Sequence, residues 1–137
     1  MSLFSIFDIA GSGMSAQSLR LNTTASNLSN AQSVSSSVNE TYRARQPVFS
    51  ASFSDYLDDS SSVGVKVDGI VESQAPLRKE YEPNHPKADA DGYIYYPNVN
   101  PVEEMANMIS ASRSFQSNVE ILNTSKQMLM RTLSLGE

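Results

Sequence analysis

Large apolar residues recur at seven-residue intervals near both ends of the chain. This spacing places side chains on one stripe of a helix and is typical of a coiled-coil seam. The pattern predicts an N-terminal helix within residues 1–40 and a C-terminal helix within residues 98–137, paired as a coiled-coil hairpin. The residues expected at the interface are Phe7, Met14, Leu21 and Leu28 in the first helix, and Met105, Met108, Phe115, Val119, Leu122, Leu129 and Leu133 in the second.

Capping and turn residues indicate where these helices end and begin. The apolar period stops in "AQSVSSS", residues 31–37, so the first helix should end there. At the start of the second helix, Asn100 can act as the N-cap and Pro101 suits the first turn. Glu103 and Glu104 then place negative charge near the helix N-terminus, where the helix dipole favours it.

The middle of the chain, residues 41–97, has shorter apolar runs separated by Pro, Gly and Asp. Valines alternate with other residues in "VGVKV", and the following Asp68-Gly69 pair is typical of a turn. These features predict a small antiparallel β-rich domain at the far end of the helical hairpin. The acidic, Ser-rich stretch 54–62 should be an exposed loop within it. The expected fold class is therefore α+β.

The predicted N-terminal helix carries little charge, because Asp8 and Arg20 are the only charged residues among residues 1–39. A single narrow seam buries too little apolar surface to offset the entropy of ordering two long helices. Interface centres are depleted of charge, so other subunits are expected to cover these neutral faces in a head-to-tail filament. A disordered Ser-rich N-terminal tail is the alternative interpretation. The seam positions between the large residues are small or polar: Ala10, Gln17, Thr24 and Ala31.

Composition excludes several classes of function. A formal net charge of -5 disfavours nucleic-acid binding, which needs clustered Lys and Arg. The chain has no Cys, so disulfides and thiolate zinc sites are excluded. We expect no membrane insertion, because no apolar run approaches the ~18 residues that a spanning helix needs. We also expect no cleaved signal peptide, because no basic residue precedes Arg20.

Two short stretches could carry chemistry. In "DADG", residues 89–92, the alternating carboxylates resemble part of a calcium loop, but the distal Glu is missing and a turn is favoured. The only histidine, His85, lies between prolines in a predicted loop. We therefore predict no catalytic residue, no cofactor and no metal site. The alternative hypothesis is a secreted calcium- or cell-wall-binding module or hydrolase, centred on Asp89, Asp91, His85 and the tyrosines of "YIYY".

Longer stretches resemble a known family. The segment "DADGYIYYPNVNPVEEMANMISASRSFQSNVEILNTSKQMLMRTLSLGE" resembles the C-terminal half of the proximal rod proteins of the bacterial flagellar basal body. "LNTTASNLSNAQS" resembles the Asn-Leu-Ala-Asn signature of flagellar rod, hook and related axial proteins, with Ser29 in place of the usual Ala. "YRARQPVF" resembles the segment that follows the first helix. The matching signature residues are Asn27, Leu28, Asn30, Tyr96, Pro97, Asn98 and Asn100.

The resemblance implies a non-enzymatic structural subunit of the proximal rod, the drive shaft that transmits torque across the periplasm. The terminal helices would form an inner coiled-coil layer in a helical assembly, with the small β domain outside. The implied partners are other copies, other rod proteins, the rod-to-ring adaptor, the membrane ring and the flagellar type III export apparatus. The implied location is the basal-body rod in the periplasmic space, reached without a cleaved signal peptide.

Overall fold

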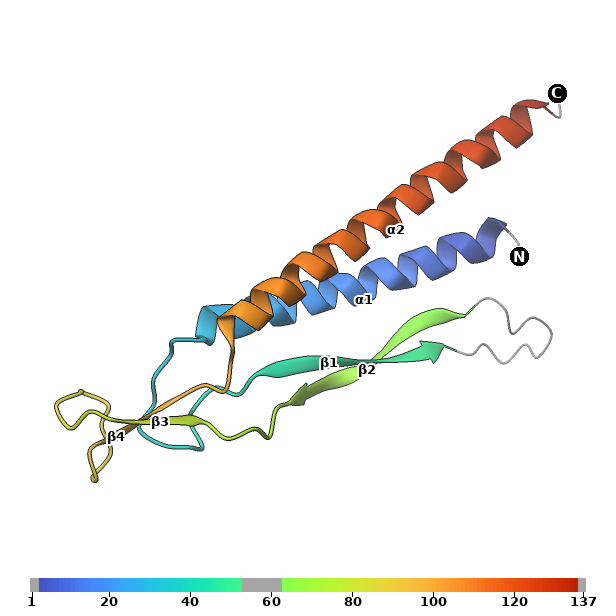
Figure 1. The fold of residues 1–137 in the computed structure, drawn as a ribbon. Helices are drawn as coiled ribbons and strands as arrows, with labels where there is room; N and C mark the ends of the chain where they lie inside the picture. The colour runs from blue at the N-terminus through green and yellow to red at the C-terminus, as the bar shows by residue number, and fades with distance from the viewer. Residues whose placement is uncertain (1–2, 53–62, 136–137) are drawn as a thin grey trace.

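The computed structural model describes residues 3–52 and 63–135. The described residues form a long helix near each end of the chain, with four strands between them in sequence, which confirms the predicted α+β fold (Figure 1). The predicted loop 54–62 lies outside the described residues. In chain order the elements are α1 (Leu3–Asn30), β1 (Arg45–Ser52), β2 (Gly64–Glu72), β3 (Arg78–Tyr81), β4 (Tyr93–Tyr96) and α2 (Pro101–Leu135).

The helix α1 is the middle layer of the molecule. It packs against α2 on one side and against the sheet of β1 and β2 on the other (Figure 1). The two helices run antiparallel, because Gly13 of α1 lies beside Asn118 of α2 and Asn27 is bonded to Glu104. The predicted pairing of the terminal helices into a hairpin is therefore present within one chain.

The sheet of β1 and β2 lies alongside α1, not at the far end of the hairpin as the sequence analysis expected (Figure 1). A two-stranded sheet is only marginally stable alone and gains stability by packing on a helix. One polar link fixes the position of β2: Ser12 Oγ accepts a hydrogen bond from Val65 N at 3.1 Å and donates to Ile9 O at 2.9 Å. Only β3 and β4 lie beyond the end of α1 (Figure 1).

The predicted turn at Asp68-Gly69 is wrong, because both residues lie inside β2. Val48 pairs with Gly69 and Phe49 pairs with Val67, so Asp68 is the extra residue of a β-bulge. Ser50 Oγ donates to Asp68 Oδ1 across the strands at 2.9 Å. The turn-forming residues therefore bend a strand where a reversal of the chain was expected.

The second sheet pairs β3 with β4, and the predicted turn in "DADG" comes directly before β4. Gly92 N donates to Asp89 O at 3.0 Å, which confirms that turn. Gly92 has φ of 82°, and a Cβ there would lie 2.9 Å from the Tyr81 ring, so only glycine fits without strain. Ile94 follows in β4 and is fully buried.

The apolar core of the described residues is small. Many large apolar side chains on α2 and on the sheet of β1 and β2 stay exposed. Alanine and one isoleucine cannot supply the burial that usually stabilises a domain of this length. The apolar residues that are buried are Ala10, Ala16, Ala44, Ile94 and Ala111.

Candidate assembly interface

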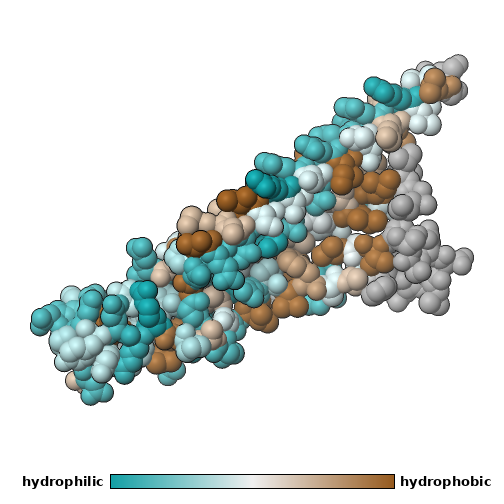
Figure 2. Space-filling view, in the orientation of Figure 1, coloured by the Kyte–Doolittle hydropathy of each residue, from teal (hydrophilic) through white to brown (hydrophobic). Residues whose placement is uncertain are grey.

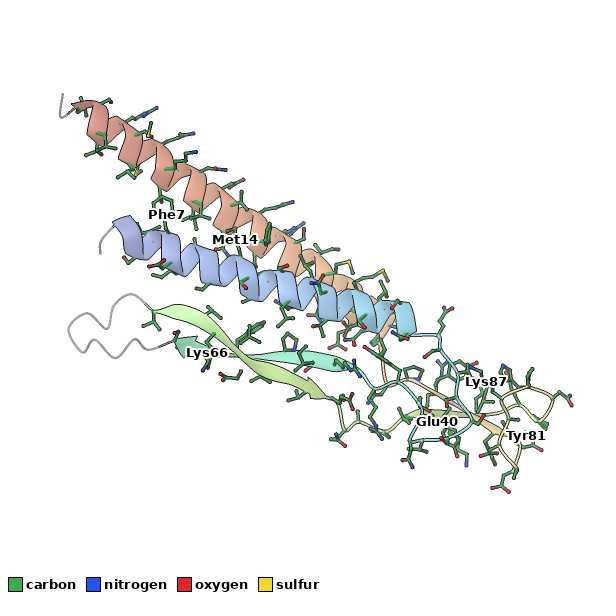
Figure 3. The ribbon with its side chains drawn as sticks, turned by 180° about the vertical axis from the view of Figure 1, so that it is seen from behind. Phe7, Met14, Glu40, Lys66, Tyr81 and Lys87 are labelled. Carbon is green, nitrogen blue, oxygen red and sulfur yellow. The ribbon has the colours of Figure 1, made fainter. Side chains whose placement is uncertain are left out.

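The predicted seam residues divide into two groups according to burial. Most are half-buried between the helices or beside them, and Figure 3 shows Phe7 and Met14 on the side of α1 that faces α2. Met105 and Leu133 are instead 46% and 63% exposed, so the described residues leave much of both side chains uncovered. The half-buried members are Phe7, Met14, Leu21, Leu28, Met108, Phe115, Val119, Leu122 and Leu129.

Small and polar residues occupy the most buried positions between the two helices. A Cβ added at Gly13 would lie 2.8 Å from Asn118 Nδ2, so the backbone of α1 approaches α2 closely there. On α2 the three buried residues, Glu104, Ala111 and Ser125, recur in the same seven-residue spacing as the apolar stripe, and the half-buried Asn118 occupies the remaining position. The spacing of large side chains does not reveal this second stripe. Its members are Glu104, Ala111, Asn118 and Ser125.

The signature residue Asn27 joins three segments of the chain near the end of α1. Its side chain is 1% exposed and makes four hydrogen bonds. Asn27 Nδ2 donates to Arg45 O at 2.8 Å and to Glu104 Oε2 at 3.1 Å. Asn27 Oδ1 accepts from Tyr42 Oη at 2.8 Å and from Arg45 N at 2.9 Å. All four hydrogen-bonding positions of the amide are thus satisfied, which explains physically why an asparagine is placed here.

Glu104 has a structural role beyond the predicted interaction with the helix dipole. It is 6% exposed, whereas the adjacent Glu103 is exposed. The predicted cap is confirmed: Asn100 Oδ1 accepts from Val102 N at 3.2 Å, and Asn100 O accepts from Glu104 N at 3.0 Å. The cap therefore fixes the first turn of α2 in the position that turns Glu104 toward Asn27.

Asn98 connects the strands to the start of α2. Its Oδ1 accepts from Ala44 N at 2.8 Å, and its Nδ2 donates to Ser73 O at 3.2 Å and Ala75 O at 2.9 Å. Together with Asn27, it holds one end of the sheet, where β1 begins and β2 ends, next to the start of α2. The side-chain amides of Asn27 and Asn98 thus connect the sheet and the helices through hydrogen bonds.

The remaining signature residues have local roles. Asn30 Nδ2 donates to Ser26 O at 2.9 Å in the last turn of α1. Pro97 is buried, and Leu28 is half-buried. The guanidinium carbon of Arg78 lies 4.3 Å from the centroid of the Tyr96 ring, a cation–π contact between β3 and β4.

The carboxylate of Asp89 is used within its own turn. It accepts from Tyr93 N at 2.8 Å and Asp91 N at 3.0 Å, and from Tyr95 Oη at 3.3 Å. The hydrogen bond from Tyr93 N is the largest cause that lowers the pKa of Asp89, and desolvation, the next largest effect, opposes it. The hydrogen bonds from Asp91 N and Tyr95 Oη and the charge of Lys79 lower the pKa further. These donors organise a turn.

Neither His85 nor the tyrosines of β4 form a recognisable catalytic arrangement. His85 Nδ1 accepts from Lys87 N at 3.0 Å. Lys79 Nζ lies 3.7 Å from the centroid of the Tyr93 ring, and Tyr81 packs edge-on against the same ring at 5.1 Å. Among the described residues, no group of three or more His, Cys, Asp or Glu side chains is placed to hold a metal ion.

Exposed apolar side chains are concentrated on α2. Figure 2 shows hydrophobic residues along the helices and toward the end of the molecule where both chain termini lie. Within the last part of α2, Ile121, Met128 and Leu135 recur every seven residues and are 47%, 58% and 87% exposed. None of the described helices has an apolar stretch long enough to cross a bilayer. Other exposed members of this helix are Val102, Met105, Ile109, Met130 and Leu133.

Two models of known protein families match segments near the two ends of the chain. Residues 7–34 match the family model described as flagella basal body rod protein, and residues 90–135 match flagellar basal body rod FlgEFG protein C-terminal. The flagellar basal-body rod protein FlgC of Salmonella typhimurium is 53% identical over 137 residues, which cover 100% of both chains. The chain belongs to the FlgC family of flagellar basal-body rod proteins. FlgC of Escherichia coli O6:H1 is also 53% identical over 100% of both chains, and FlgC of Borreliella burgdorferi is 35% identical over 98% of both.

Membership in the FlgC family confirms the resemblance found in the sequence. The family is structural and belongs to the rod of the flagellar basal body, so the chain is a rod protein and not an enzyme. It also implies assembly with other components of the rod. The alternative of a calcium- or wall-binding module or hydrolase receives no support from these relatives.

Proposed function

We propose that this chain polymerises through α1 and α2 into the helical proximal rod and transmits torque across the periplasm. One observation carries the proposal: the buried apolar residues of the two helices are alanines, while large apolar residues along α2 stay exposed. Burying one large apolar side chain fully contributes about 1.5–3 kcal/mol. Neighbouring subunits would gain that stabilisation by covering Met105, Ile109 and Met128.

The layer order of the fold supports this assignment. Because α1 lies between α2 and the sheet of β1 and β2, the sheet is kept to one side of the helical pair (Figure 1). Helices can then pack against helices of other subunits in an inner layer, with the sheet outside. The scarcity of charge on α1 favours the same arrangement, because interface centres are depleted of charged residues.

The proposed partners are other copies of this chain, other rod proteins, the rod-to-ring adaptor and the membrane ring. Export would proceed through the flagellar type III apparatus without a cleaved signal peptide, and the assembled rod would lie in the periplasmic space. The absence of Cys favours this route, because a chain without thiols cannot form wrong disulfides in an oxidising compartment.

A substitution on the exposed stripe of α2 tests the proposal. Met128→Asp, placed in the chromosomal copy, should abolish swimming and remove the rod from purified basal bodies, because it puts a charge into the proposed contact. Gln116→Glu, at an exposed position of α2 outside residues 121–135, is the matched control and should leave swimming intact. Normal rods and swimming with Met128→Asp, at normal expression, would contradict assembly through this helix.

A further inference from the structure

We propose that a groove at the start of α2 receives the distal end of α2 from a second copy, with Arg131 of that copy binding Glu104. The inference rests on the proposed function and adds the contact that joins successive copies. The groove has a volume of about 360 Å³ and lies among α1, β1 and α2. Residues of its wall include Thr24, Pro47, Phe49, Glu103, Glu104 and Asn107.

The carboxylate of Glu104 lacks a cation within the described residues. Its Oε2 accepts from Asn27 Nδ2 at 3.1 Å, and its Oε1 has no hydrogen-bond donor among them. Glu104 is 6% exposed and lies in the groove wall, so its carboxylate has a single amide donor and little contact with water. An ion pair with hydrogen bonds stabilises a carboxylate in such surroundings, and the groove therefore favours a positively charged group.

The groove wall also contains two arginines, Arg20 and Arg45, and each binds a residue other than Glu104. Arg20 Nη2 donates to Asn107 Oδ1 at 3.0 Å. Arg45 forms an ion pair with Glu72, with Nη2 3.1 Å from Oε1. Neither forms an ion pair with Glu104 among the described residues, so its carboxylate stays available to a positive charge from another molecule.

The distal end of α2 has the complementary chemistry. Residues 121–135 contain two basic residues, Lys126 and Arg131, and no acidic residue. Both are exposed, and the neighbouring Met130 is 61% exposed. An arginine fits a carboxylate through two parallel hydrogen bonds, and Met130 can pack on the partly exposed Phe49 of the groove wall.

The contact has to join two molecules. At 1.5 Å per residue, the helix separates positions 104 and 131 by about 40 Å, so the two ends of one α2 never meet. A contact between different surfaces of identical subunits repeats head to tail, and it produces a filament when the rotation does not close. The acidic first turn and the basic last turns of α2 are thus complementary surfaces for such a repeat.

A disulfide between engineered cysteines tests the geometry directly. The chain has no native Cys, and Glu103→Cys with Gln127→Cys leaves both Glu104 and Arg131 in place. Because ~36 Å separates these two positions along one helix, any bond between them joins two copies. We expect purified, oxidised basal bodies to give a ladder of dimers, trimers and larger species. Glu103→Cys with Lys66→Cys, and each single variant, should give no ladder beyond the dimer.

A double-substitution experiment tests the ion pair. Glu104→Gln keeps the acceptor for Asn27 and removes the charge, and Arg131→Gln removes the opposite charge. Each single variant should lower the amount of this chain in basal bodies by about tenfold, with normal monomer folding. The double variant should be no worse than either single one, because the two changes remove the same contact. Glu120→Gln, at an exposed position of α2 outside the groove, is the control and should match the unchanged chain.

The outcomes distinguish this inference from the proposed function. Intact rods without a ladder, or losses that add up in the double variant, would overturn the contact between Glu104 and Arg131 while leaving the rod assignment in place. If the unchanged chain is absent from purified basal bodies, the proposed function itself fails.

Discussion

Asn27 Nδ2 lies 3.1 Å from Glu104 Oε2, and this bond joins the last turn of α1 to the first turn of α2. The same amide binds the backbone of Arg45 at both its N–H and its carbonyl. One side chain therefore sets the position of both helices and of the segment that enters β1. Any change at Asn27 should disturb the hairpin and the sheet together.

Replacing this amide should destabilise the monomer. Asn27→Ala removes four hydrogen bonds and leaves the buried Glu104 without its donor. We expect the free energy of unfolding to fall by about 2–4 kcal/mol, because unsatisfied buried polar groups carry most of the cost. Urea unfolding of the purified monomer measures this free energy of unfolding. Asn22→Ala, at an exposed position of the same helix, should change it by less than about 0.5 kcal/mol.

The close approach of the helices at Gly13 can be tested by adding a methyl group. The nearest atom, Asn118 Nδ2, belongs to a flexible side chain, so Gly13→Ala should cost little, and Gly13→Leu should force the helices apart. Gly11 has no atom within 4 Å of an added Cβ, so Gly11→Ala should stabilise the helix by up to about 1 kcal/mol. Gly11→Leu is the control for Gly13→Leu, and thermal unfolding followed by circular dichroism compares the four variants. Equal effects of leucine at positions 11 and 13 would contradict the close packing.

The turn around Asp89 should depend on pH in one direction. Its pKa in the folded chain lies below the ordinary value of 3.8, chiefly because Tyr93 N donates to the carboxylate. The charged Asp89 therefore stabilises the fold in full above the pKa that it has in the unfolded chain. This stabilisation is lost as the pH falls through the lower pKa of the folded chain. Amide signals of Tyr93 and Asp91 should keep their positions from pH 7 down to about 4 and move at more acidic pH. In Asp89→Asn this acid transition should disappear, and its persistence would assign the titration to another group.

The helices could be predicted from the sequence because their apolar period is regular and Asn100 is a strong start signal. The place of the sheet could not, because alternation in β2 shows which residues share a face but not which element covers that face. Asp68-Gly69 indicated a turn, yet the bulge depends on pairing with Val48 and Phe49 in a distant strand. Local signals do not contain that information.

The interface was predicted only in part for a related reason. Large residues at seven-residue spacing were easy to find, whereas Glu104 shares its spacing with Ala111 and Ser125, which are small and carry little hydropathy signal. The burial of Glu104 follows from its bond with Asn27, 77 residues earlier. A search for small residues at the same interval as the large ones would have found this stripe.

Hydrogen exchange should show that the helices gain protection on assembly. In the isolated monomer, amides of residues 121–135 should exchange quickly, because Ile121, Met128 and Leu135 are exposed and little of the chain covers them. Amides around Ile94, which is fully buried, should be protected in both the monomer and the rod. In purified basal bodies, residues 121–135 should become protected by at least about a hundredfold, because their exposed side chains are then covered by neighbours. Strong protection of this segment already in dilute monomer would mean that the helix is stable alone, and that its exposed apolar residues are not needed for order.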